Sequence, residues 1–197
     1  MERMNERQAE MGSIAKFLTE DHRRLEQLLD RAGGPAGRID HARYEEFRAG
    51  LLRHIGMEEK ILFPAIQRAH QGQADSSLAS SLASSLAQLR LEHGALATLL
   101  MPSPTEPILA TIREILRHHD EIEETADGPY KVADDLLGQE AEVIVAALCA
   151  APSVNVMPHS DSPAVVATLH RVLARAGYSL DGRQKETDRR EAQSPER

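Results

Sequence analysis

The chain has 197 residues, of which 41% are hydrophobic and 27% charged, and its formal net charge is −8. These values predict one globular domain with small additions, and they argue against nucleic-acid binding, which ordinarily needs a basic face. The only cysteine, Cys149, excludes a disulfide within the chain and any zinc or iron–sulfur site built from several of its own cysteines. No long apolar run predicts a membrane span, and the polar N-terminal segment lacks a secretory-signal pattern, so we expect a cytoplasmic protein that does not bind membranes.

The first two helices are indicated by apolar residues that recur at spacings of three and four. Residues 1–12 are polar and lack this periodicity, which predicts a flexible N-terminal arm. Ser13 is a suitable N-cap for the first helix, and the glycine- and proline-rich run at 31–37 ends it. Asp40 is the expected N-cap of a second helix that continues to about His70.

Three further helices are predicted in the middle of the chain. Pro64 lies inside the second helix and should bend it, because proline removes one backbone hydrogen bond. The run SSLASSLASSLA places leucine at every fourth position and indicates a third helix over 75–101. A fourth helix is expected at about 106–126 and a fifth at about 130–150, separated by a Gly-Pro pair.

No alternating pattern typical of strands occurs, so the predicted fold class is all-α. The simplest arrangement is an antiparallel up-down four-helix bundle within residues 13–150, with additional C-terminal helices. Residues 151–177 are interpreted as a linker and a short amphipathic helix, which either covers the bundle or meets a protein partner. Residues 178–197 are charged and nearly devoid of apolar side chains, which predicts a disordered tail.

Histidines interrupt the apolar stripe of each of the four bundle helices, and in two of them a glutamate follows one turn later. Residues four apart lie about 6 Å apart on one face of a helix, so such a pair can converge on one metal ion. Buried glutamate is rare unless it is paired or bound to metal. The predicted metal ligands are His22, His54, Glu58, His93, His119 and Glu123.

The ligand pattern repeats between the two halves of the bundle. Each half supplies one histidine and then a His-x-x-x-Glu motif, within the related runs LLRHIGMEEKILFP and ILRHHDEIEETADGP. Helices alternate in direction in an up-down bundle, so the repeat predicts a pseudo-twofold site between two hairpins, suited to two metals. If Glu58 and Glu123 both bridge, each metal has two histidines and two carboxylate oxygens.

Several alternatives remain open from the pattern alone. His118 precedes His119, but the residue four positions after it is Ile122, so His119 with Glu123 is favoured. Any single histidine on an apolar stripe is more often an ordinary core residue, and a metal-free helical interaction protein is therefore an alternative. Cys149 is expected to be buried. Four acids adjacent to the predicted ligands could either orient them or form a solvated face: Asp21, Glu59, Glu92 and Glu124.

The motifs are similar to those of the hemerythrin-like family, also called the HHE cation-binding domain. The matching runs are DHRRLEQLL, RHIGMEEKILFP, LRLEHGAL and HHDEIEE, which contain the six predicted ligands. The resemblance covers about residues 13–150. It implies a four-helix bundle that holds a non-haem centre of two iron ions, with histidine and carboxylate ligands and an oxo or hydroxo bridge.

The sequence departs from the oxygen carriers of that family. Those proteins use five histidines, with a pair one turn apart on the third helix, whereas Leu89 and Ala97 lie one turn from His93 here. We therefore expect a protein that binds or turns over peroxide, O₂ or nitric oxide, as a detoxifier or a sensor, rather than a reversible O₂ carrier. The alternative is iron storage, iron delivery or iron–sulfur repair, although the cysteine-bearing N-terminal segment of the repair proteins is missing.

Overall fold

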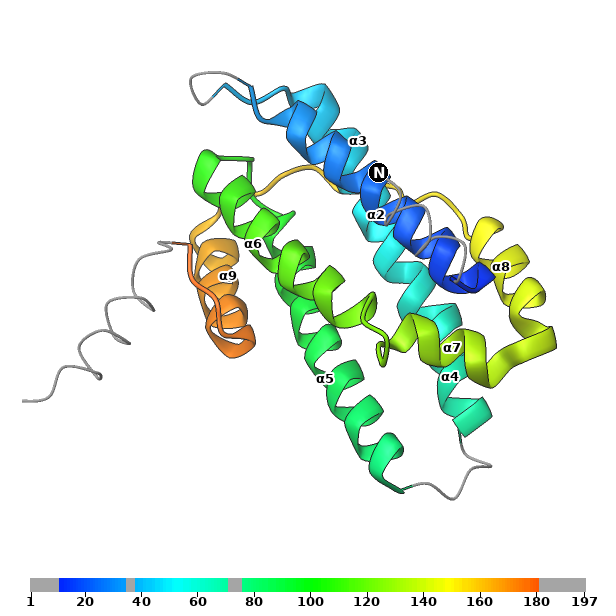
Figure 1. Ribbon diagram of the computed structural model, residues 1–197. Coiled ribbons are helices and arrows are strands. Elements are labelled where there is room, and N and C mark those ends of the chain that lie inside the picture. Colours follow the sequence, from blue (N-terminus) through cyan, green and yellow to red (C-terminus); the bar gives the residue numbers. More distant parts are fainter. Residues whose placement is uncertain (1–10, 35–37, 71–75, 181–197) are drawn as a thin grey trace, which may run out of the picture.

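The computed structural model describes residues 11–34, 38–70 and 76–180, without the side chains of 76–79. This part of the chain is helical (Figure 1), and the predicted all-α class is confirmed. No helix in the described ranges is long and apolar enough to cross a membrane. The predicted arm and charged tail lie mostly outside these ranges. The elements are α2 (Ser13–Ala32), α3 (His41–Met57), the π-helical segment η2 (Glu58–Leu62), α4 (Phe63–His70), α5 (Ser76–Leu99), α6 (Glu106–Glu123), α7 (Pro129–Leu137), the 3₁₀ segment η3 (Gly138–Glu140), α8 (Ala141–Cys149) and α9 (Pro163–Ala176).

Two helical hairpins form the bundle. α2 packs against α3, which continues through η2 into α4, and α5 packs against α6. Two buried apolar clusters lie at opposite ends of the bundle, and their members show that the helices alternate in direction. Along α2 the chain passes from Leu18 in one cluster to Leu25 in the other, and along α3 it returns from Leu51 to Met57. On each of these helices the predicted histidine ligand falls between the residues of the two clusters, and the two glutamates lie at the edge of the first cluster.

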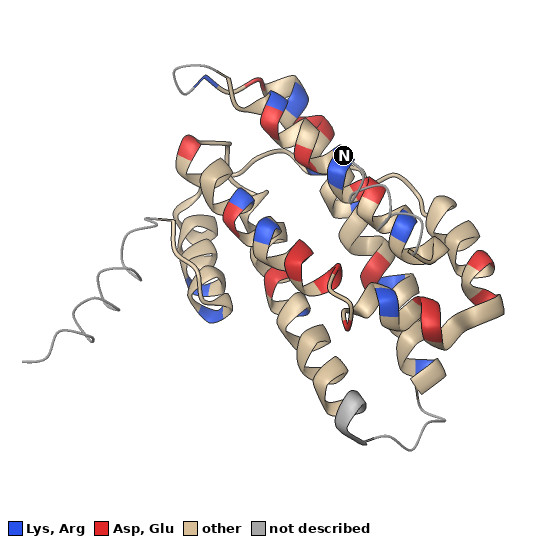
Figure 2. Cartoon of the chain, in the orientation of Figure 1, with Lys and Arg blue, Asp and Glu red and all other residues tan. Residues whose placement is uncertain are grey.

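The remaining helices cover the bundle. α7 packs against α2 and α4, α8 packs against α2 and η2, and α9 packs along α5 (Figure 1). Leu169 and Leu173 of α9 are buried in the same apolar cluster as the end of α5, so this amphipathic helix covers the bundle. Charged residues of both signs are interspersed along α2, α6 and α7 (Figure 2). Cys149 is exposed, and the expectation that it is buried is wrong.

Helix ends differ from the predicted ones where another part of the chain intervenes. Ser13 is the first residue of α2 rather than its N-cap, and the carboxylate of Asp134 in α7 accepts hydrogen bonds from the N–H groups of Ile14 and Ala15. The first-turn N–H groups are therefore satisfied by a distant side chain. Asp40 caps α3 as expected, by accepting a hydrogen bond from the N–H of Arg43.

Two irregular segments shape the surroundings of the predicted ligands. A bend is expected at Pro64, and the irregular segment found nearby is a π-helical turn, η2, that ends two residues before this proline. The fourth helix ends at Glu123, three residues earlier than predicted, and a tight turn follows. A Cβ added at Gly128 would lie 2.4 Å from the Glu123 carbonyl oxygen, so only glycine fits this turn. The predicted fifth helix is divided into α7 and α8 by η3, which begins at Gly138 with φ 47°.

Candidate metal centre

All six predicted ligands are buried and converge between the two hairpins. They form two groups of four, and within each group the donor atoms lie within 4.8 Å of one another. One group contains His22 and His54, the other contains His93 and His119, and both contain the two glutamates. The sequence repeat predicts this grouping. The two histidines of each group come from the two helices of one hairpin.

Glu58 spans the two groups. One of its carboxylate oxygens lies 3.4 Å from Nε2 of His54, and the other lies 3.1 Å from Nε2 of His93. Glu58 is fully buried in the π-helical segment η2, one turn after His54. Its two oxygens thus point toward histidines of different hairpins, which is the geometry required of a bridging carboxylate.

Glu123 repeats this arrangement from α6. Its two oxygens each lie 3.4 Å from an imidazole Nε2, one on His22 and the other on His119. Within each group the two Nε2 atoms also approach closely, at 2.9 Å between His22 and His54 and at 3.1 Å between His93 and His119. Each pair of histidines is therefore aimed at a common point beside two carboxylate oxygens.

The donor atoms fit a pair of cations. Glu58 Oε2 and Glu123 Oε1 are buried and make no hydrogen bond, although imidazole nitrogens lie close by. A buried carboxylate oxygen without a partner is costly, and a metal ion beside it would remove that cost. Imidazole together with carboxylate is a donor set that suits iron, manganese or zinc.

The second ring nitrogen of each histidine contacts a carboxylate on another helix. These contacts leave Nε2 free for a metal, because a carboxylate that accepts from Nδ1–H fixes both the tautomer and the ring orientation. The acids are the four neighbours of the predicted ligands, so the alternative in which they only form a solvated face is wrong. The pairs are His22–Glu124 at 2.9 Å, His54–Asp21 at 2.9 Å, His93–Glu59 at 2.7 Å and His119–Glu92 at 3.0 Å.

This outer layer follows the same pseudo-twofold symmetry as the inner one. Asp21 and Glu92 each precede a histidine on the first helix of a hairpin, and each contacts the histidine of the other helix in that hairpin. Glu59 and Glu124 each follow one of the two shared glutamates and contact a histidine of the opposite hairpin. Exchanging the two hairpins therefore exchanges each of these four contacts with an equivalent one.

Opposite charges dominate the electrostatics of the centre. Burial lowers the pKa of His22, but hydrogen bonds to Glu123 and Glu124 outweigh it and raise this pKa to about 10. Burial raises the pKa of Glu58, but the neighbouring imidazoles of His54 and His93 outweigh it and hold this pKa well below its ordinary value. These opposite charges favour protonated imidazole and ionised carboxylate in the metal-free centre, so a metal ion that binds there has to displace protons.

Tyr130 is a residue of the centre that the sequence pattern did not place. Its hydroxyl oxygen lies 2.5 Å from Glu58 Oε1, 2.8 Å from Glu123 Oε2 and 3.0 Å from His22 Nε2. The tight turn after α6 returns the chain to the centre and positions this side chain at the start of α7. One difference between the two copies of the repeated motif could have pointed to it. The residue that follows the proline is Tyr130 in the second copy and Ala65 in the first.

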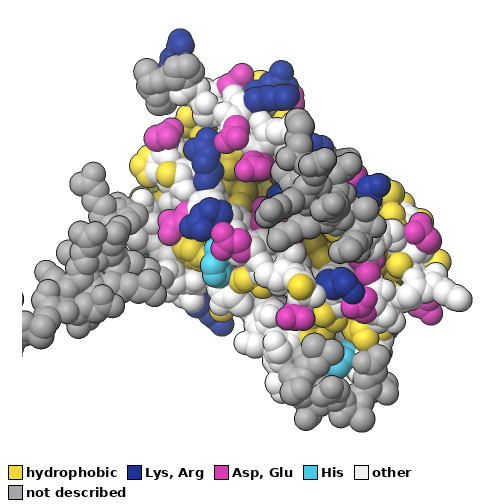
Figure 3. All heavy atoms as spheres, viewed as in Figure 1, with side chains coloured by type: hydrophobic (Ala, Val, Ile, Leu, Met, Phe, Trp, Pro, Cys, Tyr) yellow, Lys and Arg dark blue, Asp and Glu magenta, His cyan; other side chains and the backbone are white. Residues whose placement is uncertain are grey.

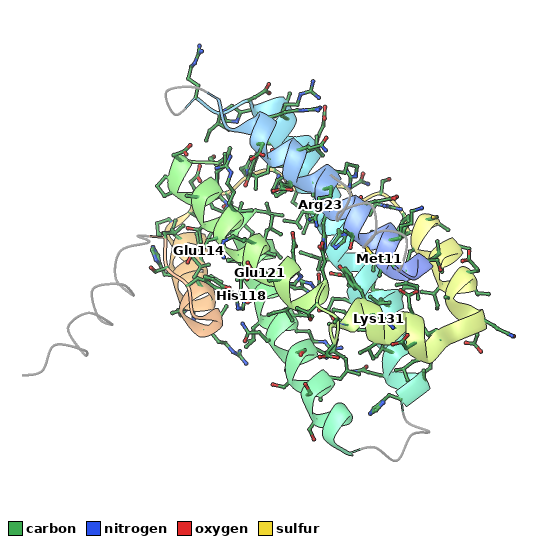
Figure 4. The ribbon with its side chains drawn as sticks, in the orientation of Figure 1. Met11, Arg23, Glu114, His118, Glu121 and Lys131 are labelled. Atoms are coloured by element: carbon green, nitrogen blue, oxygen red, sulfur yellow. The ribbon has the colours of Figure 1, made fainter. Side chains whose placement is uncertain are left out.

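His118 lies outside both groups. Its side chain is 47% exposed, on the side of α6 that faces α9 (Figure 4), and its Nδ1 lies 2.8 Å from Glu92 Oε1. The hydroxyl of Tyr178, which follows α9, donates to the same oxygen at 2.9 Å. Glu92 therefore connects the C-terminal segment to His119, which it contacts through its other oxygen.

We expect His119→Ala to lower the metal content of the purified protein strongly and His118→Ala to lower it only slightly. The reason is that Nε2 of His119 faces Glu123, whereas Nδ1 of His118 faces Glu92 of the outer layer and the hydroxyl of Tyr178. Metal analysis after identical reconstitution of both variants measures the difference. The reverse order would mean that α6 is rotated by one residue in the metal-bound protein.

A cleft between α2 and α6 leads to the centre. It has a volume of about 1160 Å³, and His22, His54, His119, Glu123 and Tyr130 are among the residues that line it. Its walls include apolar side chains of both helices, and hydrophobic atoms are visible between charged ones on this face (Figure 3). Arg23 and Lys131 also line it (Figure 4). Small molecules can therefore reach the buried donors from this side.

Comparison with known proteins gives one match. The family described as Hemerythrin HHE cation binding domain matches residues 13–130, which include all six predicted ligands and end at Tyr130. No curated protein and no solved structure matches the chain. α8 and α9 lie beyond the matched region. More than half of the chain is matched, and it belongs to the hemerythrin HHE cation-binding family.

Proposed function

We propose that this protein holds two iron ions in the buried centre and that they bind or turn over a small oxidant, namely O₂, peroxide or nitric oxide. The observation that carries the proposal is the pair of four-donor groups that share Glu58 and Glu123. His22 and His54 would hold one ion, and His93 and His119 the other. The chain is then a metal protein of the hemerythrin family that acts as a detoxifier or a sensor.

Two iron ions held by these residues would supply one-electron and two-electron redox chemistry toward small oxygen and nitrogen species. The protein positions the ligand atoms and excludes bulk water. The four outer carboxylates hold each Nε2 toward its ion, so little reorganisation is needed when metal binds. The apolar clusters above and below the centre keep bulk water away, and the cleft between α2 and α6 admits small molecules.

Turnover or sensing is favoured over reversible O₂ carriage by the number of nitrogen donors. Leu89 and Ala97 occupy the positions one turn from His93, and Leu89 is buried in an apolar cluster. Among the described residues, no histidine other than the four predicted ones belongs to either donor group. Fewer nitrogen donors leave more exchangeable positions at the irons, so a bound oxidant is more easily reacted or replaced.

The test is the response of the reduced, iron-loaded protein to O₂. We expect rapid oxidation to the ferric form, and modest decomposition of added peroxide that is lost in Glu58→Ala and kept in Glu46→Ala. Glu46 is a suitable control because it is an exposed residue of α3 whose contacts are with Arg43. A visible spectrum that forms with O₂ and disappears on purging with argon would instead establish reversible carriage. Bound iron that reacts with none of the three molecules would favour storage or delivery.

A further inference from the structure

Tyr130 breaks the pseudo-twofold symmetry of the centre. Its hydroxyl approaches Glu58 Oε1 and Glu123 Oε2, which are the oxygens directed to the group that contains His22 and His54. The opposite oxygens of the same two carboxylates, directed to His93 and His119, make no hydrogen bond. The two groups thus have equal sets of histidines and carboxylates but differ by one oxygen atom.

The side chains at the equivalent place near His93 provide no such oxygen. Phe63 stacks on His93 with ring centroids 5.8 Å apart, whereas the ring of Tyr130 lies 5.6 Å from that of His22. Ala65, which follows the proline in the first copy of the motif, is buried and has no donor atom. The group with His22 and His54 therefore has the phenol of Tyr130 beside it, whereas the group with His93 and His119 has the phenyl ring of Phe63.

The spacing of the Tyr130 oxygen resembles that of a donor rather than that of a distant neighbour. Metal–nitrogen and metal–oxygen bonds of about 2.0–2.2 Å, at roughly right angles, place adjacent donors of one ion about 3 Å apart. The Tyr130 oxygen lies 2.5, 2.8 and 3.0 Å from three donor atoms of the same group. It also lies in the buried interior, since Tyr130 is 1% exposed.

We propose that Tyr130 is a seventh protein ligand and binds, as a phenolate, the ion held by His22 and His54. This inference rests on the proposed two-ion centre. When the oxygen–metal bond forms, the O–H bond breaks and its proton is released to solvent, as for other protonated ligands, and no oxidant or reductant is required. The ion held by His93 and His119 then has one protein donor fewer, so the two metal positions are chemically different.

The test is the visible absorption and resonance Raman spectrum of the iron(III)-loaded protein. A phenolate bound to ferric iron produces a charge-transfer band, and excitation in that band enhances the ring vibrations of the bound tyrosinate. We expect this signature in the wild type, and we expect its loss in Tyr130→Phe with both irons retained. Tyr44→Phe and Tyr178→Phe are matched controls that should keep it, because the chain has three tyrosines, Tyr44 lies in an apolar cluster and the hydroxyl of Tyr178 donates to Glu92 of the outer layer.

Each result decides the inference. A wild-type protein that binds two irons without the tyrosinate signature overturns the role of Tyr130 and leaves the two-ion centre intact. A signature that persists in Tyr130→Phe also overturns it. Failure of the wild type to bind metal overturns the proposed function and this inference together. Should Tyr130→Phe not fold, a signature retained in both control variants assigns the ligand to Tyr130 by elimination.

Discussion

Glu58→Ala should release both metal ions, whereas the loss of one histidine should weaken mainly one. Each oxygen of Glu58 faces a different pair of histidines, so the substitution removes one donor from both groups and leaves three in each. The metal content after anaerobic reconstitution with Fe(II) should fall from two ions per chain to nearly none. Atomic-emission analysis of the desalted protein measures this content.

Glu46→Ala controls for the loss of a glutamate from the same hairpin, since this exposed residue lies on α3 away from both groups. Glu58→Gln keeps the side-chain volume and removes the charge, and its helical content by circular dichroism shows whether the bundle remains folded. One ion retained in Glu58→Ala would mean that this carboxylate does not bridge. Each ion would then have to be held without it.

Local patterns in the sequence were sufficient to predict the inner part of the centre. Each predicted histidine lies between apolar residues at helical spacing, as His22 does between Leu18 and Leu25, so its face follows from the helix alone. Burial of four such stripes in one bundle brings the histidines together without further information. The two glutamates follow for the same reason, since Glu58 and Glu123 are each one turn from a histidine of the stripe.

The features that were missed depend on how separate elements meet. Tyr130 reaches the centre only because the turn at Gly128 is tight enough to reverse the chain, and the length of a turn cannot be deduced from helical periodicity. Asp134 replaces Ser13 as the cap of α2 because α7 crosses the end of that helix. The partner of each outer acid depends on the rotation of neighbouring helices, so adjacency in sequence indicated which acids matter but not which histidine each one contacts.

Removing the metal should destabilise the fold substantially. The centre buries four histidines and two glutamates, and in the metal-free protein these groups are compensated by one another, by the outer acids and by the hydroxyl of Tyr130. A ligand that binds only the folded state stabilises it by about 4 kcal/mol when its concentration is a thousandfold above Kd. For a domain of this size, that corresponds to a rise in Tm of about 10 °C, since each kcal/mol shifts the midpoint by roughly 2–4 °C.

Thermal unfolding followed by circular dichroism, with and without anaerobic Fe(II), measures this rise. The Glu58→Ala variant is the matched control, because a protein that has lost both ions should melt at the same temperature in either condition. Glu46→Ala should behave as the wild type, since its contacts lie outside the centre. An equal rise in Glu58→Ala and the wild type would mean that iron stabilises the chain at some other place. No rise in the wild type would show that the buried histidines and glutamates stabilise the bundle by their own ion pairs, as a metal-free polar core.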